Sequence, residues 1–156
     1  TLFNMIAPWI PGSSFLDLFA GSGGIGIEAL SRGAKRVTLV ERSGQAASII
    51  AKNISKIRME GSDEIRFHKK STAQALELLG QAGEKFDIIF MDPPYKDVPQ
   101  RLEETAKYIH DFDMLSPEGM LIVEHDKDCE MPEEIGGLKC VRSCSYGLTV
   151  ITFFKV

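Results

Sequence analysis

The chain has 156 residues, of which 44% are hydrophobic and 26% are charged, a composition typical of one globular domain and not of a disordered segment. Its apolar runs are far shorter than the roughly 18 residues that span a bilayer, so we expect no membrane segment. The formal net charge of −4 argues against strong nucleic-acid binding by this stretch alone, because phosphate neutralisation requires clustered lysine and arginine.

The cysteines favour a reducing, cytoplasmic compartment. They number three, without a C-x-x-C pair, and the chain does not start with a cationic and apolar leader. The three histidines form no ligand pattern with them, and we therefore expect no metal site. Small apolar fillers in or near strands are the preferred interpretation of Cys129, Cys140 and Cys144.

The first half of the chain predicts helices and strands in alternation, read from hydrophobic periodicity and from glycine and proline positions. In chain order we expect a helix over residues 2–9 stopped by Pro11-Gly12, a strand over 15–19, a helix from 25 to 33, a strand over 36–41, a helix over 43–57 with four isoleucines on one face, a strand over 65–68, and a helix that begins at Ser71.

The second half continues the alternation and ends differently. We expect a strand over residues 86–91, a turn enforced by Pro93 and Pro94, a helix over 100–112, a strand over 119–124, and two strands, 138–145 and 148–155, that form a hairpin near Tyr146-Gly147. Alternating strands and helices predict a doubly wound, Rossmann-like α/β fold with a seven-stranded, mostly parallel sheet and an antiparallel C-terminal hairpin strand. Such sheets bind ligands beyond the carboxyl ends of their strands.

The glycine-rich segment after the first strand predicts a nucleotide-type cofactor site. Gly21, Gly23 and Gly26 form G-x-G-x-x-G between a strand and a helix, where the backbone can approach a ligand closely. An acid within the strand, Asp17, would repel the pyrophosphate of NAD but suits the ammonium of S-adenosylmethionine. The alternative for Asp17 is a carboxylate that caps nearby backbone amides.

Glu41 follows Gly21 by twenty positions, at the end of the next predicted strand. A carboxylate there can accept both hydroxyls of a ribose. Both cofactor types use such a group, so Glu41 does not distinguish them. The alternative is a surface glutamate paired with Arg42.

The sharpest motif is Asp92-Pro93-Pro94-Tyr95, after the strand over 86–91. The lone pair of a base amine is delocalised into the ring, so the amine attacks a methyl group only when acceptors hold its N–H bonds. The Asp92 carboxylate and the Pro93 carbonyl can supply two acceptors, and the prolines keep them preorganised. Tyr95 offers a ring for base stacking. The alternative is a proline turn with an incidental acid and aromatic residue.

These motifs, FLDLFAGSGGIGIEALSRGA, VTLVER and FDIIFMDPPY, with LFNMIAPWIPG before them and YGLTVITFF at the end, resemble the bacterial 16S rRNA guanine-N2 methyltransferase family called RsmD, of the class I methyltransferase fold. The resemblance covers nearly the whole chain. Family members carry a basic segment before the LFN helix. Because this chain starts at Thr1 within a helix pattern, we expect that segment to be missing from it.

The resemblance implies roles for individual residues. The cofactor S-adenosylmethionine would contact Asp17, Phe19, Ala20, Gly21, Ser22, Gly23, Glu41, Arg42, Ser71 and Thr72, and the target base would contact Asp92, Pro93, Pro94 and Tyr95. Such families usually present an aspartate to the adenine amine after the third strand, where this chain has Ser71-Thr72. We therefore expect weaker cofactor affinity, and a low-micromolar dissociation constant would contradict this.

The sequence thus predicts that residues 1–156 form one S-adenosylmethionine-dependent catalytic domain. By the resemblance it would methylate guanine N2 in 16S rRNA, by analogy at position 966, with ribosomal RNA, the small subunit or an assembly intermediate as partner. The absence of a cysteine near the DPPY loop argues against a C5-methylation route. Three alternatives remain: the same chemistry on adenine N6 of DNA or RNA or on a protein glutamine, an NAD-binding oxidoreductase, and a cofactor-binding module without catalysis.

Overall fold

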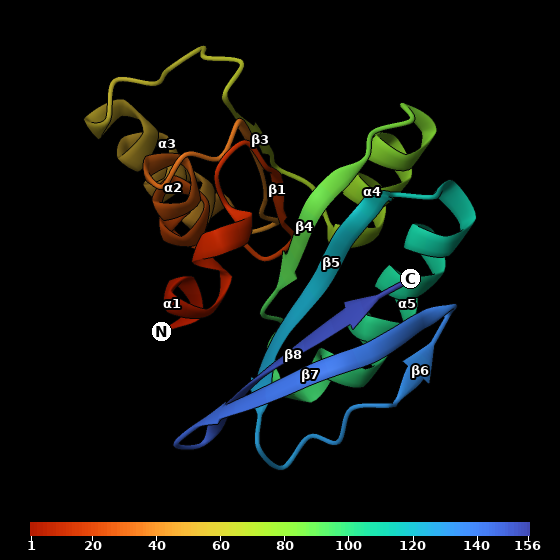
Figure 1. The fold of residues 1–156 in the computed structure, drawn as a ribbon. Helices are drawn as coiled ribbons and strands as arrows, with labels where there is room; N and C mark the ends of the chain where they lie inside the picture. The colour runs from red at the N-terminus through yellow and green to blue at the C-terminus, as the bar shows by residue number, and fades with distance from the viewer. The chain divides into compact units, whose positions relative to one another are not determined.

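The computed structural model describes residues 1–156. Two compact units make up the chain, residues 1–75 and residues 76–156, and Figure 1 shows the path of the chain through both. None of the helices combines the length and the apolar character that crossing a membrane requires.

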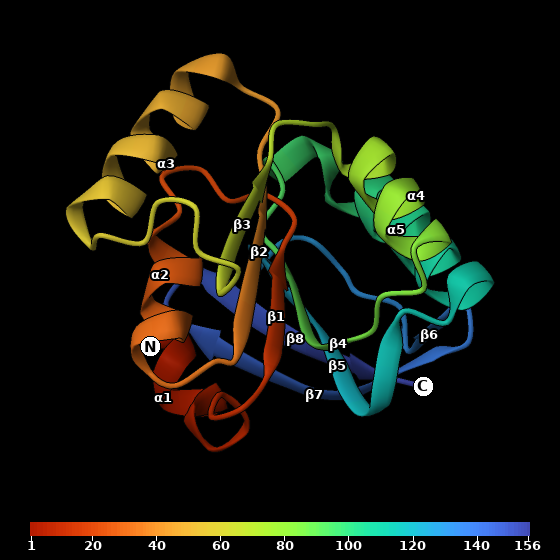
Figure 2. The same cartoon turned by 90° about the horizontal axis from the view of Figure 1, so that it is seen from above.

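The first unit is a parallel sheet with helices. β1 pairs with β2 and β2 pairs with β3, in parallel in both cases, so that β2 lies in the middle. Figure 2 shows α2 and α3 together on one side of these strands. Its elements are α1 (Leu2–Ile6), the 3-10 helix η1 (Ala7–Trp9), β1 (Ser14–Asp17), α2 (Gly24–Ser31), β2 (Arg36–Val40), α3 (Gly44–Lys56) and β3 (Ile65–His68).

The core of the first unit confirms most of the predicted apolar positions, but not all of them. Of the isoleucines expected on one face of α3, Ile50 is buried while Ile49 is 43% and Ile57 39% exposed. Consecutive residues of a helix point about 100° apart, so Ile49 and Ile50 cannot both face the strands. Trp9 is likewise 45% exposed, because the helix tightens into η1 at Ala7 and its apolar stripe no longer continues.

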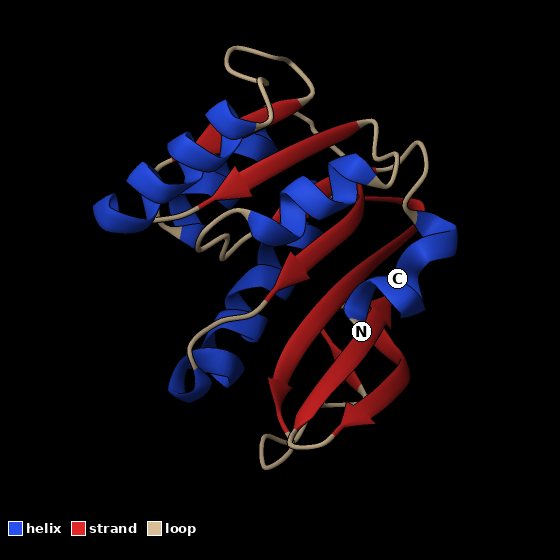
Figure 3. Cartoon of the chain, turned by 90° about the vertical axis from the view of Figure 1, so that its left-hand side faces the viewer, coloured by secondary structure: helices blue, strands red, loops and turns tan.

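The second unit combines a parallel strand pair with an antiparallel meander. β4 and β5 are parallel, and β5, β8, β7 and β6 follow one another in antiparallel pairs. The long C-terminal strands stand out in red in Figure 3. After α4 (Thr72–Gln81), which begins in the first unit, come β4 (Phe86–Met91), the 3-10 helix η2 (Tyr95–Asp97), α5 (Val98–Phe112), β5 (Leu115–Asp126), β6 (Glu134–Ile135), β7 (Leu138–Tyr146) and β8 (Thr149–Lys155).

The predicted C-terminal hairpin is therefore confirmed as β7 and β8. Seven strands were expected, and the structure has eight. The additional strand is β6, whose two residues are too few to give an alternating pattern in the sequence.

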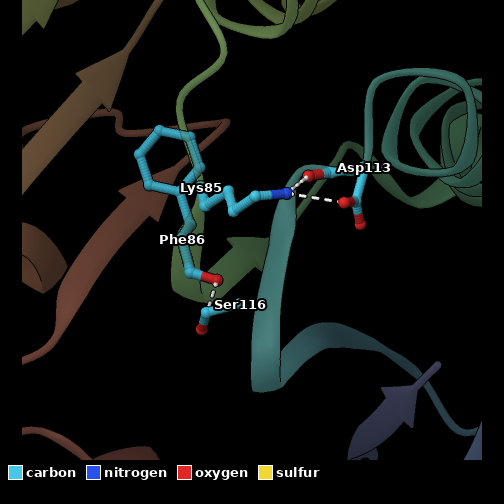
Figure 4. A network of polar contacts seen from close by, with 4 residues as sticks. All are labelled: Lys85, Phe86, Asp113 and Ser116. Carbon is cyan, nitrogen blue, oxygen red and sulfur yellow. Dashed lines mark hydrogen bonds and ion pairs between the residues drawn. The ribbon is translucent and has the colours of Figure 1, made fainter.

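β5 begins four residues before the predicted strand because it contains a bulge. Phe86 pairs with Leu115, but Ile88 pairs with Met120, so the register shifts over residues 116–119. Within this bulge the Ser116 hydroxyl donates to the Phe86 carbonyl at 3.2 Å (Figure 4). A Cβ on Gly119 would lie 2.8 Å from that same carbonyl oxygen, so the bulge has room only for glycine there.

A polar contact ties the chain before β4 to the end of α5. The Lys85 ammonium donates to the Asp113 carbonyl oxygen at 2.7 Å and to its carboxylate at 2.6 Å (Figure 4). Asp113 ends α5 in a left-handed conformation, φ 51°, which leaves carbonyls at the helix terminus for such a cation. The starts of β4 and β5 are thereby held side by side, and the register after the bulge brings Met91 beside Val123 at their other ends.

Candidate active site

The glycine-rich turn has the shape that the motif predicts. Gly21 and Gly23 adopt positive φ angles of 57° and 83°, which only glycine adopts at little cost. A Cβ on Gly21 would meet nothing within 4 Å, so the backbone of the turn faces open space there. A Cβ on Gly26 would instead lie 2.3 Å from Leu39 Cδ2. This third glycine therefore serves the packing of α2 on β2.

Glu41 ties this turn to the end of β2. Its two carboxylate oxygens accept hydrogen bonds from the backbone N–H groups of Gly21 and Ser43, both at 2.9 Å. A carboxylate has about four acceptor positions, so each oxygen retains capacity for a further donor such as a ribose hydroxyl. Arg42 is exposed beside it.

Asp17 ends β1 and is 1% exposed. Its Oδ1 accepts from the Phe19 backbone N–H at 3.1 Å, so the alternative role of capping a backbone amide is present in the structure. Ala20, which follows, is buried, and its N–H donates to the Val40 carbonyl at 2.9 Å. The turn is thus fastened to β2 by a backbone bond as well as by Glu41.

A helix residue that the sequence analysis missed also holds the turn. The Asn53 amide in α3 donates to the Ser22 carbonyl at 2.8 Å. A single asparagine within a helix carries no sequence signal. The Ser22 side chain is itself exposed, and its hydroxyl accepts from the Gly24 N–H at 3.3 Å.

Ser71 follows β3 and caps α4. Its hydroxyl accepts from the Gln74 N–H at 3.2 Å while the Gln74 side-chain oxygen accepts from the Ser71 N–H at 3.1 Å, the reciprocal pattern of a capping box. One acceptor position of Ser71 is therefore occupied. Thr72, the first residue of α4, is buried.

The DPPY motif lies at the end of β4 on a cavity of about 200 Å³. Asp92, Pro93 and Tyr95 line this cavity, and Pro94 instead turns the chain, with its carbonyl accepting from the Asp97 N–H at 2.8 Å. The Tyr95 ring is 58% exposed and offers a face to a planar ligand. The remaining lining residues are Val98, Glu124, His125, Asp126 and Thr149.

Asp92 has a carboxyl partner in this cavity. The register places Met91 beside Val123, so that Asp92 follows beside Glu124, and the two carboxyl groups share a hydrogen bond. Burial and the neighbouring Asp92 raise the pKa of Glu124 to about 7. Although Asp92 as a residue is exposed, its carboxyl group is partly withdrawn from water. That desolvation raises its pKa, and the hydrogen bond with Glu124 offsets part of the rise.

Glu124 and His125 are among the cavity residues that the sequence analysis did not select. His125 is buried, and its two ring nitrogens lie 2.9 Å from the Asp126 carbonyl oxygen and 2.7 Å from the Thr152 hydroxyl. The available signal for Glu124 was its place as an acid at the predicted end of the strand over 119–124. Using it required the register between β4 and β5, which the sequence does not show.

The two sets of residues support different tasks. In the first unit, a turn of exposed backbone with Glu41 and the buried Asp17 presents acceptors that suit the hydroxyls and the ammonium of S-adenosylmethionine. In the second unit, the cavity presents the Asp92 and Glu124 carboxyl groups beside an aromatic ring. This combination suits a planar group with N–H donors.

Comparisons with known proteins place the chain in a family. The model of the family described as "Conserved hypothetical protein 95" matches residues 1–155. The protein named "Putative rRNA methyltransferase YlbH" of Bacillus subtilis is 37% identical over 99% of this chain and 82% of its own length. Ribosomal RNA small subunit methyltransferase D of Escherichia coli is 34% identical over 85% of this chain. The matched part is only 63% of that enzyme's length.

The solved structures agree with these sequence relatives. A conserved hypothetical protein from Streptococcus pyogenes has a TM-score of 0.84 and 35% identity, and the match covers 98% of this chain and 91% of that one. The predicted α/β class, with parallel strands followed by antiparallel C-terminal strands, is confirmed. The chain belongs to the Conserved hypothetical protein 95 family, that is, to the RsmD-like S-adenosylmethionine-dependent methyltransferases.

Proposed function

We propose that this chain transfers a methyl group from S-adenosylmethionine to the exocyclic N2 amine of a guanine in small-subunit rRNA, with position 966 as the first candidate. The observation that carries the proposal is the cavity at the end of β4, where Asp92, Pro93 and Tyr95 lie together. Relatives named as rRNA methyltransferases support the substrate class.

The cofactor residues would be those of the first unit. Glu41 would accept from the ribose hydroxyls, and the buried Asp17 would hold the ammonium, while the backbone of Gly21 and its neighbours would let the cofactor approach closely. The bound cofactor supplies an electrophilic methyl group on a sulfonium. The Ser71 hydroxyl, already engaged in capping α4, would contribute at most one further acceptor position.

The amine residues would be those of the second unit. Asp92 would accept a hydrogen bond from the target N2 amine, and the Pro93 carbonyl would accept the other, so that the nitrogen lone pair is less delocalised into the ring. The exposed face of Tyr95 would stack on the base, an interaction worth about 1–3 kcal/mol. The base has to leave any helical stack to reach the cavity, so an unpaired or splayed nucleotide is the expected target.

Transfer of labelled methyl groups tests the proposal. Small ribosomal subunits and naked rRNA from cells that lack the modification would be compared with DNA and protein as acceptors, and the methylated base identified by mass spectrometry. Asp92→Ala should lose turnover and retain the binding of S-adenosylhomocysteine measured by calorimetry. Asp128→Ala, an exposed aspartate on the turn after β5, is the matched control and should keep full activity.

The outcomes separate the proposal from its alternatives. Label on adenine N6 or on a glutamine would keep the methyl-transfer chemistry and overturn the guanine assignment. Unchanged activity of Asp92→Ala would overturn the role of the DPPY loop. The family assignment favours methyl transfer over an NAD-dependent oxidoreductase, and a catalytically silent protein on every acceptor would instead support a binding module.

A further inference from the structure

The base site contains more carboxyl groups than amine activation needs. Asp92 and the Pro93 carbonyl provide two acceptors for an amine, yet Glu124 lies at hydrogen-bond distance from Asp92 and lines the same cavity. It belongs to a different strand, β5, and reaches this position through the register that pairs Met91 with Val123.

Guanine and adenine both carry an exocyclic amine, but they differ at N1, the ring nitrogen beside that amine. Guanine presents the N1–H donor next to its N2 amine, so N1 and N2 are two adjacent donors. Adenine presents the N1 acceptor next to its N6 amine. Two adjoining carboxylates accept from both guanine donors, whereas with adenine the second carboxylate would face a lone pair. The paired acids therefore match guanine.

We infer that Glu124 is the specificity-determining residue of the base site, its ionised carboxylate accepting a hydrogen bond from guanine N1–H while Asp92 accepts one from the N2 amine. This inference rests on the proposed function and adds to it the reason for choosing guanine. No lysine or arginine lines the cavity, so no such side chain is paired with the two carboxylates before the base arrives.

Two other polar side chains of the cavity, His125 and Asp126, have partners of their own. Both ring nitrogens of His125 have partners, the Asp126 carbonyl and the Thr152 hydroxyl, so this ring offers no free acceptor to N1–H. Asp126 Oδ1 accepts from the Asp128 N–H at 2.8 Å. Tyr95 lines the cavity and is largely exposed. Its ring can stack on the base, a task that differs from accepting N–H donors. Among the acids that line the cavity, Glu124 is the one that shares a hydrogen bond with Asp92, which places it as the second acceptor.

The proton balance of the pair agrees with this assignment. Burial and the nearby Asp92 raise the pKa of Glu124 to about 7, so near neutral pH the two carboxyl groups hold one proton between them for about half of the time. A ligand with two N–H donors stabilises the form in which both are ionised. Guanine binding would therefore release that proton to solvent.

The test compares guanine with 2-aminopurine at the methylated position. 2-Aminopurine keeps the N2 amine, but its N1 is an acceptor without a hydrogen. Small-subunit RNA would be assembled from synthetic and transcribed pieces with either base, and kcat/KM measured for the chain and for two variants. The wild type should prefer guanine by about 10- to 100-fold, the range expected for one hydrogen bond to a charged group.

Glu124→Gln should bring this preference to within about threefold, because a neutral amide can accept from guanine N1–H and donate to N1 of 2-aminopurine. Glu118→Gln changes a carboxylate on the same strand that is 93% exposed and should keep the wild-type preference. Melting temperature and S-adenosylhomocysteine affinity would be measured for both variants. If Glu124→Gln does not fold, the wild type alone still tests the inference. Its preference for guanine over 2-aminopurine should decline as the pH falls through about 7, since protonated Glu124 can donate to N1 of 2-aminopurine.

The failures are distinguishable. A wild type that methylates guanine N2, together with a Glu124→Gln variant of undiminished preference, would overturn the inference and leave the proposed function standing. A pH-independent preference in the wild type would overturn it as well. If the wild type labels no guanine in rRNA, the proposed function fails, and the inference fails with it.

Discussion

Replacing Gly26 with alanine should both destabilise the chain and weaken cofactor binding. The added Cβ would lie 2.3 Å from Leu39 Cδ2 and 2.8 Å from Val37 Cγ1, and both of these β2 side chains are 0% exposed. Neither can swing into water, so α2 has to move away from β2. Overpacking of this kind costs about 1–3 kcal/mol, and alanine recovers about 1 kcal/mol of helix propensity.

The net loss is then about 0–2 kcal/mol, and we expect the upper part of this range because the 2.3 Å contact is with a side chain that cannot move into water. For a domain of this size each kcal/mol lowers the melting temperature by about 2–4 °C. Calorimetry or denaturant titration would measure the loss. Titration with S-adenosylhomocysteine would report the second effect, because α2 begins at Gly24, directly after the glycine turn, and a displaced helix moves that turn.

Gly24→Ala is the matched control in the same helix. There the nearest atom to the new Cβ is Ser22 Oγ at 3.4 Å, an ordinary contact, so stability should be unchanged or slightly higher. The reasoning would be refuted if Gly26→Ala were as stable as the wild type, or if both glycine variants lost stability equally.

Four further expectations follow from other contacts. Below about pH 7, kcat/KM for guanine should fall as Glu124 is protonated and level off at a total loss of no more than about 10- to 100-fold, and Glu124→Gln should lack this dependence. Since folding raises the pKa of Glu124 from 4.5 to about 7, the folded state binds more protons in that window and the wild type should lose stability as the pH rises through it. Melting curves would show this loss, and Glu124→Gln should lack it. Asn53→Ala removes the hydrogen bond to the Ser22 carbonyl and should weaken S-adenosylhomocysteine binding by about 2- to 10-fold, with an unaltered affinity speaking against a positioning role. Gly119→Ala should destabilise the chain more than Gly24→Ala, because its Cβ would press on backbone atoms of Phe86 and Ser116, and equal melting temperatures would contradict that.

Local patterns were sufficient to predict much of the fold. The strands at residues 65–68 and 86–91 have the predicted boundaries because the first alternates apolar and polar residues and the second is a short, mostly apolar run ended by Asp92 and two prolines. Ser71 was predicted to begin a helix, and it caps α4. Gly21 and Gly23 were selected from the motif alone, and both adopt positive φ angles in the turn.

Features that depend on pairing between distant residues were not predicted. The exposure of Ile49 follows from the rotation of α3 about its axis, which its periodicity did not settle. The pairing of Asp92 with Glu124 depends on the register of β4 and β5, and that register is set by the Ser116 and Gly119 contacts. No sequence pattern in either strand indicates this bulge.

The bulge in β5 determines which side chain of β5 lies next to Asp92. Without it, the pairing of Phe86 with Leu115 would continue unchanged and bring Leu121 opposite Asp92. The base site would then have the Asp92 carboxylate beside an aliphatic leucine side chain in place of a second carboxylate. A change in loop length at residues 116–119 is thus equivalent to exchanging a residue of the base site, although the residues of the base site are themselves not mutated.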